Sequence, residues 1–593
     1  MHVLGISCHY HDAAAALLRD GVLVAAAQEE RFSRKKHDAA FPLRAIEFCL
    51  QQAGLEAADL DHVVFYEKPF AKGERLMTTI VATFPRSLRL FREGIHVWLK
   101  EKIWIKALIQ KHLGTPPDRI LFVDHHLSHA ASAFFASPFE DAAVLTVDGV
   151  GEWTTATCGR GTGDWGQGGT NRLELSQELR FPHSLGLLYS VFTAFLGFEV
   201  NEGEYKVMGM APFGQPRYVE QIRSIMELRE DGSLWLDPAY MRFHDTERAF
   251  TRRFEAVFGA PRNPKARFVT AATSLYDDPN PPTTEELRRN QYYADLAASI
   301  QQVTEDVMIA MARHVHRQTG LTKLCLAGGV ALNCVANYKV LRATPFEEIY
   351  VQPAAGDAGG ALGAALYAYH VLLGRPRQFV MDHAAWGKAY GEAAIADALR
   401  DGGWSFGRLD DDERALDQAV DALQRGEVVG WYHGRFEWGP RALGHRSILA
   451  DPRREDMKDI VNIKIKFREP FRPFAPSVLA EKAAQCFDLG EAAKHYPTRF
   501  MLYVAPVTTD RAPAITHADG SSRPQAVHRE FNPRYHRLIE KFAEATGVPL
   551  VLNTSFNLKG DPIVSTPADA LDTFARSGMD LLLLENFVVR KSW

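Results

Sequence analysis

Two histidines four residues apart give this sequence its clearest sign of chemistry. The segment Val123–Ala133 reads VDHHLSHAASA and places His125 and His129 one turn apart on the same face of an expected helix, after a strand at Ile120–Val123. Two imidazoles in this arrangement can bind one divalent ion, whereas His126 points to another face. A lone pair of this kind is more often incidental at a helix N-terminus, so a metal site requires further ligands.

Two aspartates can supply those ligands. Asp148 stands near the end of a buried strand expected at Ala143–Gly149, and Asp357 lies in the segment Ala354–Ala361, AAGDAGGA, whose glycines let the backbone approach a ligand. Two imidazoles and two carboxylates suit Fe(II), Mn(II) or Zn(II) and leave positions open for substrate oxygens. The sequence therefore predicts a metal site built from these four side chains, with all three ions as candidates.

Two weaker motifs carry glycine or clustered charge. Gly328–Asn333, GGVALN, follows an expected strand, and its glycines allow backbone amides to reach a phosphate at a helix N-terminus, although a plain tight turn would also explain them. Near the N-terminus, His11 and Asp12 precede the run Glu29–His37, EERFSRKKH. Such a run is usually a solvated face, but after an alanine-rich strand it could instead aim Lys36 into a cleft.

A basic segment marks the C-terminal part of the chain. Between Arg435 and Arg472 there are ten Lys or Arg and six Asp or Glu, a local charge of +4 in a chain of net charge −5. Lys464 and Lys466 are two apart on an expected strand and would share one face, with Arg468 and Arg472 following. Surface salt bridges are the ordinary explanation, but the interleaved prolines and glycines favour a pocket for a small anion.

The elements that must position these residues begin with three apolar runs, at Val3–Ser7, Ala143–Gly149 and Leu324–Gly329, each ending in small or polar residues. The first is followed by a hairpin signal, Asp20-Gly21. A strand and hairpin that recur, with a later Gly-Gly turn, indicate two similar α/β lobes that clasp a nucleotide, as in actin, Hsp70 and sugar kinases. An ordinary doubly wound sheet would fit the same runs.

The rest of the chain divides by composition. Residues 225–290 are polar and proline-interrupted, which predicts an insertion with exposed loops. Helical spacing predicts a helix at Tyr292–Gln318, and Leu372–Arg377 reads as a helix end and linker. A second α/β unit is expected beyond it, with strands at Val428–Tyr432 and Pro549–Asn553.

Composition excludes several classes of protein. The 593 residues are 46% hydrophobic and 24% charged, which is typical of globular chains and not of disordered ones. A net charge of −5 gives no global attraction for nucleic acid. Six scattered cysteines argue against a disulfide scaffold or a zinc knuckle. The N-terminus does not read as a signal peptide, and no apolar run approaches the ~20 residues of a membrane helix. We therefore expect a cytoplasmic protein without membrane or nucleic-acid partners.

Taken together, the motifs closely resemble the O-carbamoyltransferases of the NodU/CmcH/TobZ family, nearly from end to end. The resemblance rests on His11-Asp12, EERFSRKKH, HHLSH, VDGVGEW, NEGEYKVMGMA, AGGVALN, GDAGGALG, GPRALGHRSILAD, REPFRPFAPS and LNTSFN. It implies an α/β fold with a TsaD-like, actin-type domain at residues 1–380 and a YrdC-like domain at residues 381–593. It also implies a role in the biosynthesis of antibiotics or of related carbamoylated compounds.

The resemblance also implies a division of labour. The C-terminal domain would form carbamoyl adenylate from carbamoyl phosphate and ATP, with Mg²⁺, and the N-terminal domain would transfer the carbamoyl group to a hydroxyl of a natural product or sugar-like acceptor. By the same resemblance, the metal ligands would be His125, His129, Asp148 and Asp357, with Fe(II) first among the candidate ions. His11 would be the catalytic base, with Lys36 on the acceptor side. Gly329 and Asn333 would contact the nucleotide, and carbamoyl phosphate and ATP would be contacted by Arg441, Lys466, Arg472, Arg523 and Asn553.

Elementary chemistry agrees with these roles. Adenylation turns carbamoyl phosphate into a better donor to an alcohol, a metal ion can polarise the carbamoyl carbonyl, and an imidazole can accept the hydroxyl proton. Two other functions compete: a tRNA threonylcarbamoyladenosine-type modifying enzyme, which the acidic charge disfavours, and a non-catalytic ATP-clasping module, which leaves the metal set and the basic segment without a role. A homodimer is possible.

Overall fold

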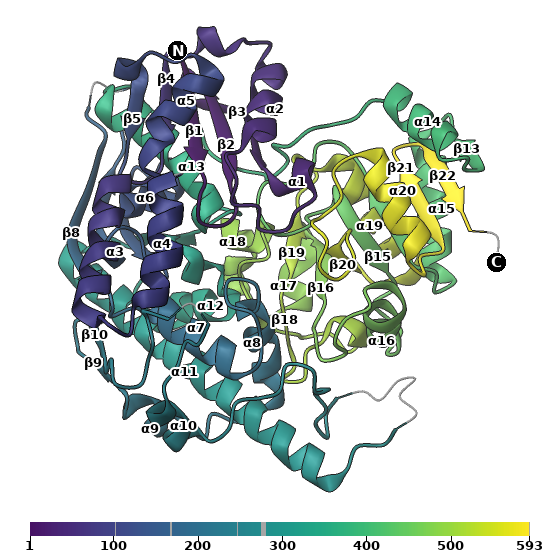
Figure 1. Ribbon diagram of the computed structural model, residues 1–593. Helices are drawn as coiled ribbons and strands as arrows, with labels where there is room; N and C mark the ends of the chain where they lie inside the picture. The colour runs from purple at the N-terminus through teal and green to yellow at the C-terminus, as the bar shows by residue number, and fades with distance from the viewer. Residues whose placement is uncertain (101, 167–168, 246, 274–279, 592–593) are drawn as a thin grey trace. The chain divides into compact units, whose positions relative to one another are not determined.

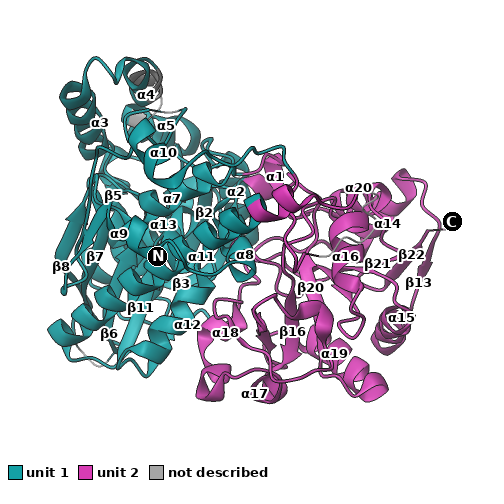
Figure 2. Ribbon diagram, turned by 90° about the horizontal axis from the view of Figure 1, so that it is seen from below, with its two compact units in different colours: residues 1–29, 37–266, 289–381 teal, residues 30–36, 267–288, 382–593 magenta. Residues whose placement is uncertain are grey.

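The computed structural model describes residues 1–100, 102–166, 169–245, 247–273 and 280–591. The chain forms two compact units (Figure 2). The first contains residues 1–29, 37–266 and 289–381, and the second contains residues 30–36, 267–288 and 382–593. Two short segments from earlier in the chain, 30–36 and 267–288, therefore cluster with its C-terminal part.

Two sheets of the same topology form the core of the first unit (Figure 1). The first contains β1 (His2–Ser7), β2 (Ala14–Arg19), β3 (Val22–Gln28), β4 (His62–Phe65) and β5 (Ile120–Phe122), in the order β3-β2-β1-β4-β5. The second contains β6 (Asp141–Val147), β7 (Thr154–Thr162), β8 (Arg172–Arg180), β11 (Lys323–Ala327) and β12 (Glu348–Tyr350), in the order β12-β11-β6-β7-β8.

The pairing confirms the predicted duplication. In each sheet an antiparallel meander of three strands is followed by two strands parallel to the first, β4 and β5 beside β1, and β11 and β12 beside β6. The hairpin expected at Asp20-Gly21 joins β2 to β3, and both residues have positive φ, 50° and 81°, as a tight hairpin turn requires. The first unit thus has the duplicated α/β lobes of the actin-type fold.

Helices cover these sheets. They are α2 (Leu43–Ala53), α3 (Pro69–Thr83), α4 (Leu88–Lys100), α5 (Ile105–Leu113), α6 (His125–Phe134), α7 (Leu185–Phe195), α8 (Glu204–Met210), α9 (Val219–Arg223), α10 (Arg252–Phe258), α11 (Thr284–Thr319), α12 (Cys334–Ala343) and α13 (Asp357–Tyr367). The helix predicted at 292–318 is α11, which begins earlier. The predicted loops of 225–290 are interrupted by β9 (Met226–Leu228), β10 (Leu234–Leu236) and α10, so that expectation was only partly correct.

Small residues let α13 approach its neighbours closely. A Cβ added at Gly363 would lie 1.8 Å from the carbonyl oxygen of Ser128 in α6, and one at Gly5 of β1 would lie 1.8 Å from that of Ala361 in α13. No side chain larger than hydrogen fits at either contact. The sequence AGGALGAAL therefore fixes the first residue of α13, Asp357, relative to α6.

The second unit is built on a mixed sheet. Its strands are β13 (Phe406–Arg408), β14 (Val429–Tyr432), β15 (Arg446–Ala450), β16 (Ala475–Leu479), β19 (Gln525–Val527), β20 (Leu550–Ser555), β21 (Leu581–Leu584) and β22 (Phe587–Arg590), in the order β13-β22-β21-β14-β15-β20-β16-β19. A separate pair joins β17 (Ala505–Pro506) to β18 (Ser521–Ser522). The strands predicted at 428–432 and 549–553 are β14 and β20, which confirms the second α/β unit.

The helices of this unit are α1 (Glu30–Ser33), α14 (Glu392–Asp401), α15 (Asp412–Gln424), α16 (Met457–Ile460), α17 (Ala483–Cys486), α18 (Tyr496–Arg499), α19 (Pro533–Thr546) and α20 (Pro567–Arg576).

One local prediction was wrong. Lys464 and Lys466 do not lie on a strand, because α16 continues as a π-helical turn at Val461–Ile465 and Lys466 follows that turn. The apolar positions Met457, Val461 and Ile465, all buried, recur every fourth residue, which is a helical spacing that outweighs the short alternation around the lysines.

The six cysteines are buried and form no disulfide, as expected for a chain without a disulfide scaffold. Among the helices that the structure describes, none is long and apolar enough to cross a membrane.

The α13–α6 contact predicts a specific loss of stability. Replacing Gly363 by alanine should reduce the free energy of unfolding by about 1–3 kcal/mol, because the new Cβ meets backbone that cannot move aside like a side chain. Urea unfolding measures this change. The matched control is Gly407→Ala on β13, where an added Cβ meets nothing within 4 Å. Equal stability of the two variants would contradict the packing described.

Candidate metal centre and active site

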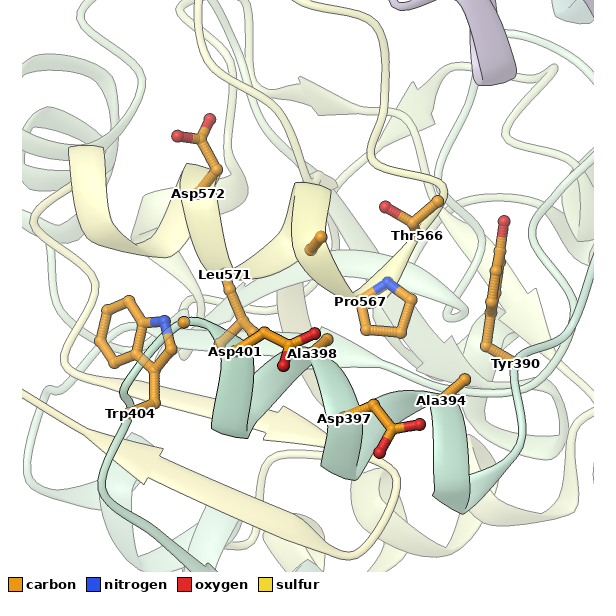
Figure 3. Close-up of a pocket in the computed structure, with 12 residues that line it drawn as sticks. Tyr390, Ala394, Asp397, Ala398, Asp401, Trp404, Thr566, Pro567, Leu571 and Asp572 are labelled. Atoms are coloured by element: carbon orange, nitrogen blue, oxygen red, sulfur yellow. The ribbon is translucent and has the colours of Figure 1, made fainter.

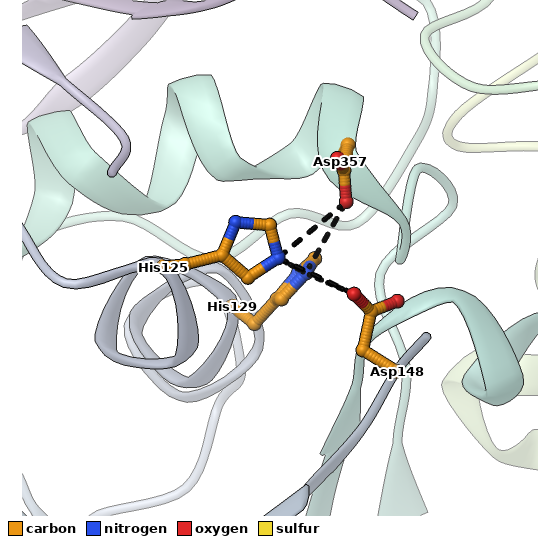
Figure 4. Close-up of side chains that lie close together, drawn as sticks. All are labelled: His125, His129, Asp148 and Asp357. Atoms are coloured by element: carbon orange, nitrogen blue, oxygen red, sulfur yellow. Dashed lines mark hydrogen bonds and ion pairs between the residues drawn. The ribbon is translucent and has the colours of Figure 1, made fainter. Parts of the chain in front are cut away.

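Four side chains from three parts of the first unit converge on one point (Figure 4). His125 and His129 come from the first two turns of α6, Asp148 directly follows β6, and Asp357 opens α13. All four side chains are buried, and their candidate ligand atoms lie within 4.8 Å of one another. The structure thus brings together the four residues that the sequence singled out.

The distances between donor atoms suit one small cation. The two Nε2 atoms are 3.0 Å apart. Asp148 Oδ2 lies 3.3 Å from His125 Nε2 and 3.9 Å from His129 Nε2, and Asp357 Oδ1 lies 3.6 Å from each. Ligands at 2.0–2.2 Å from a tetrahedral ion are separated by about 3.4 Å. The donor set and its spacing therefore fit a divalent transition metal ion.

The electrostatics of the cluster favour a positive charge at its centre. Burial alone would lower the pKa of His125, but Asp357 and Asp148 outweigh it and raise that pKa to about 9. Burial would raise the pKa of Asp357, but the neighbouring histidines lower it to about 2. Asp357 Oδ2, buried, has no hydrogen-bond partner among the described residues. A proton on an imidazole or a metal ion can supply the charge that these carboxylates require.

Glu152 holds the metal-ligand helix in place. The side chain of the N-cap residue of α6, Asp124, makes no capping bond. Instead Glu152 Oε1 accepts hydrogen bonds from the backbone amides of His125, at 3.1 Å, and of Lys68, at 2.8 Å. A carboxylate at this helix end is also favoured by the helix dipole. The sequence showed Glu152 within the VDGVGEW motif but gave no signal of this role.

His126 points away from the cluster, as predicted, and locks α6 against the second sheet. Its Nε2 donates to the carbonyl of Thr154 at 2.9 Å, so its Nδ1 accepts from the hydroxyl of Thr146 at 2.6 Å. Burial and the two neighbouring histidines lower the pKa of His126 to about 3. This imidazole is neutral and structural.

His11 is held by a carboxylate beside the cluster. Asp12 accepts from His11 Nδ1 at 3.0 Å and from His37 Nδ1 at 2.8 Å. In neutral His11 this bond places the proton on Nδ1 and leaves Nε2 free to accept one. Burial would lower the pKa of His11, but Asp357 and Asp12 raise it to about 9. Since a base must be neutral to act, compensation of Asp357 by a cation would favour the role predicted for His11.

The glycine turn contacts the metal cluster directly. The amide of Gly329 donates to Asp148 Oδ1 at 2.8 Å, and Gly328 has φ of 93°, which only glycine adopts readily. Asn333 caps α12 by accepting from the amide of Ala336 at 3.1 Å, and its side chain exchanges two hydrogen bonds with Gln301. Gly329 therefore orients the carboxylate of Asp148, and the side chain of Asn333 is held by hydrogen bonds to Gln301 and to the start of α12.

In the second unit, Lys466 lies at the centre of a basic cluster. Its ammonium donates to the carbonyls of Ser555 and Asn557, at 2.6 and 2.7 Å, and to Asn557 Oδ1 at 2.7 Å. Burial and the positive charges of Arg468, Arg472 and Lys36 hold the pKa of Lys466 well below its usual range. Lys36, which the family resemblance assigns to the acceptor side, thus belongs to this basic cluster in the second unit.

Three other predicted residues lie on strands or loops of the same unit. Asn553 of β20 is buried and donates to Ser477 Oγ at 2.9 Å and to the carbonyl of Ala442 at 3.2 Å, while its Oδ1 accepts from no described residue. Arg523, between β18 and β19, makes no hydrogen bond or ion pair within the described part of the chain. Arg441 follows β14 and is half-buried.

A hollow of about 670 Å³ in the second unit lies elsewhere, between α14 and α20 (Figure 3). It is lined by Trp404 and Tyr390 and by the carboxylates of Asp397, Asp401 and Asp572. Among the described residues that line it, none belongs to the predicted site, and its acidic lining is unsuited to phosphates.

Comparison with known proteins establishes the family. Residues 2–366 match the family model of the carbamoyltransferase N-terminus, and residues 420–591 match that of the carbamoyltransferase C-terminus. The chain belongs to the carbamoyltransferase family and is a transferase enzyme.

Two relatives are similar to this chain over nearly all of its length, and a third is similar over less than half of it. An uncharacterized protein of Synechocystis, sll1178, is 45% identical and covers 100% of this chain and 97% of its own length. The nodulation protein NolNO of Sinorhizobium fredii is 37% identical over 98% of this chain and 79% of its own length. The 3'-hydroxymethylcephem-O-carbamoyltransferase of Amycolatopsis lactamdurans is 35% identical over 42% of this chain and 44% of its own length.

The cluster predicts how metal affinity depends on its carboxylates. Asp357→Asn should weaken the binding of Fe(II), Mn(II) or Zn(II) by about a hundredfold or more, because it removes one anionic ligand from a site that burial shields from water. Metal titration of chelator-treated protein measures the affinity, and circular dichroism before metal addition checks the fold.

The matched control is Asp124→Asn, which removes a half-exposed carboxylate at the end of the same helix, ion-paired with Lys68. Its metal affinity should equal that of the unchanged protein. Tight metal binding by Asp357→Asn would contradict a metal centre made of these four residues, and collapse of the fold on chelation alone would mean that the bound ion is structural.

Proposed function

We propose that this carbamoyltransferase acts in two steps, each in its own unit, and carbamoylates a hydroxyl of a small-molecule acceptor. Carbamoyl phosphate, ATP and water give carbamoyl adenylate, pyrophosphate and phosphate in residues 381–593, and the N-terminal domain, residues 1–380, passes the carbamoyl group to the acceptor. The observation that carries the proposal is the convergence of His125, His129, Asp148 and Asp357 in the unit that holds His11.

The basic cluster of the second unit supports the first step. The pKa of Lys466 is lowered by burial and by the positive charges of Arg468, Arg472 and Lys36. The repulsion among these four charges is therefore only partly relieved within the protein. Phosphate groups of carbamoyl phosphate and of ATP with Mg²⁺ would relieve that repulsion and be held by charge-assisted hydrogen bonds. Arg441, Arg523 and Asn553 are proposed as further contacts to these substrates.

The geometry of the first unit supports the second step. The acceptor oxygen attacks the carbamoyl carbon, the bond from that carbon to the phosphate oxygen breaks, and AMP leaves. His11 Nε2 takes the hydroxyl proton, while Asp12 keeps the other ring nitrogen protonated and fixes the ring. Asp12, its pKa lowered by hydrogen bonds to His11 and His37, stays ionised throughout.

The four clustered residues would hold a divalent ion, for which Fe(II) is our first choice and Mn(II) or Zn(II) the alternatives. Such an ion supplies Lewis acidity at the carbamoyl carbonyl. Gly329, through its bond to Asp148, keeps that carboxylate oriented, and Glu152 keeps His125 in register. We place the nucleotide near Gly329 and Asn333.

The division of labour is tested by two substitutions. His129→Ala should reduce carbamoyl transfer by about a hundredfold or more while carbamoyl adenylate and pyrophosphate are still formed from ATP and carbamoyl phosphate, since it removes a ligand of the transfer site only. Lys466→Ala should abolish adenylate formation, yet the variant should still use added carbamoyl adenylate. Mass spectrometry of carbamoyl adenylate and of carbamoylated hydroxyl compounds follows both steps.

Lys494→Ala serves as the control, because Lys494 is an exposed lysine of the second unit paired only with Glu491; it should leave both steps unchanged. Loss of both steps in His129→Ala, or failure of Lys466→Ala to use the adenylate, would contradict two separate sites. The same assay with tRNA as acceptor tests the runner-up, a threonylcarbamoyladenosine-type enzyme, which the net charge of −5 disfavours.

A further inference from the structure

Helix α3 presents two cations near the transfer site that the reaction described so far does not use. Lys72 and Arg75 are three residues apart and lie on one face of α3. Lys72 is buried and ion-paired with Glu67, which is fully buried. Arg75 is half-buried. Burial and the charge of Arg75 would lower the pKa of Lys72, but Glu67 and Asp357 outweigh them and raise it. Glu67 and Glu152 are the carboxylates that act on Arg75.

Arg75 keeps most of its donors free of protein partners. Its NH1 group donates to the carbonyl of Gly151 at 2.8 Å, and its guanidinium lies 5.4 Å from the ring centre of Phe181. Its Nε and NH2 groups donate to no described residue, and no described carboxylate forms an ion pair with it. Burial accordingly lowers the pKa of Arg75. A shielded guanidinium with a free edge is suited to a carboxylate or phosphate.

Each cation contacts a residue that in turn contacts one of the proposed reacting groups, His11 or the metal ligand His125. The ammonium of Lys72 lies 5.1 Å from the ring centre of Tyr10, and that ring lies 4.5 Å from the ring of His11. Gly151, which Arg75 binds, packs so tightly on the imidazole of His125 that an added Cβ would lie 2.9 Å from it. The pair therefore lies next to residues that contact the predicted base, His11, and a predicted metal ligand, His125.

We propose that Arg75, assisted by Lys72, binds an anionic group of the acceptor, so that the acceptor is a hydroxylated carboxylate or phosphate. The inference rests on the proposed function and narrows its substrate class. Lys72 and Arg75 lie beside residues that contact His11 and His125. The turn at Gly329, where we place the nucleotide, contacts Asp148 instead. We therefore assign the anion to the acceptor and not to the nucleotide.

The experiment compares alcohols that differ in charge. The full-length protein with its metal, carbamoyl phosphate and ATP is given glycerol 3-phosphate or glycerate, and in parallel glycerol, at equal concentration. Mass spectrometry should show carbamoylation of an anionic alcohol at about tenfold or more the rate of glycerol. Arg75→Gln should remove this preference, and Arg75→Lys, which keeps the charge, should retain part of it.

A binding measurement accompanies the turnover measurement. Glycerol 3-phosphate should raise the melting temperature of the unchanged protein and of the control Arg313→Gln, an exposed arginine of α11 that also binds only a carbonyl, but not that of Arg75→Gln. Pyrophosphate release from ATP and carbamoyl phosphate in the absence of any acceptor should be the same in all variants, which separates a failure of this inference from a failure of the proposed function.

Three results would overturn the inference. They are equal use of glycerol and the anionic alcohols, carbamoylation of neither anionic alcohol while pyrophosphate release proceeds, and a preference for anions that survives in Arg75→Gln. Product inhibition by AMP that weakens about tenfold in Arg75→Gln would assign the guanidinium to the nucleotide phosphate instead.

Discussion

The first unit buries two carboxylates that require a positive charge beside them. Two buried carboxylates and two imidazoles meet with their donor atoms 3.0–3.9 Å apart, and burying uncompensated carboxylates is costly. The shift of the pKa of His125 to about 9 shows how strongly these groups attract a positive charge. A divalent ion meets this requirement fully, and by neutralising Asp357 it would also release His11 to act as a base.

The surrounding structure serves to hold these four donors together. Gly363 lets α13 contact α6, so that Asp357 reaches the histidines. Glu152 caps α6 in place of a local N-cap side chain, and Gly329 binds the second oxygen of Asp148. Each of these contacts joins segments far apart in the sequence, and each acts on a ligand through backbone groups. The same loop that carries Glu152 also carries Gly151, which connects the centre to Arg75.

Much of this could be predicted from sequence because the signals are periodic or local. The four-residue spacing of His125 and His129 and the end of a buried strand at Asp148 gave three members of the cluster, and glycine content pointed to Asp357. The duplicated lobes followed from repeated strands and a hairpin. The strand predicted for Lys464 and Lys466 was wrong. The prediction relied on the alternation of these two lysines, whereas the buried apolar residues around them recur every fourth position, which is a helical spacing.

Other features leave no mark in the sequence. Glu152 accepts a hydrogen bond from a backbone amide, and Arg75 is notable because most of its donors have no partner among the described residues. Residues 30–36 cluster with the C-terminal unit through bonds of Arg31 to the carbonyl of Gly439 and of Arg34 to that of Ile563. Bonds from side chains to backbone carbonyls have no complementary residue type, so pattern and composition cannot reveal them.

X-ray absorption spectroscopy of the protein loaded with one equivalent of Fe(II), Mn(II) or Zn(II) tests the central claim most directly. The account predicts a coordination shell of nitrogen and oxygen with the scattering pattern of two imidazoles, and no sulfur. A shell without imidazole, or one containing thiolate, would show that the ion binds elsewhere and that the four converging side chains are not a metal centre.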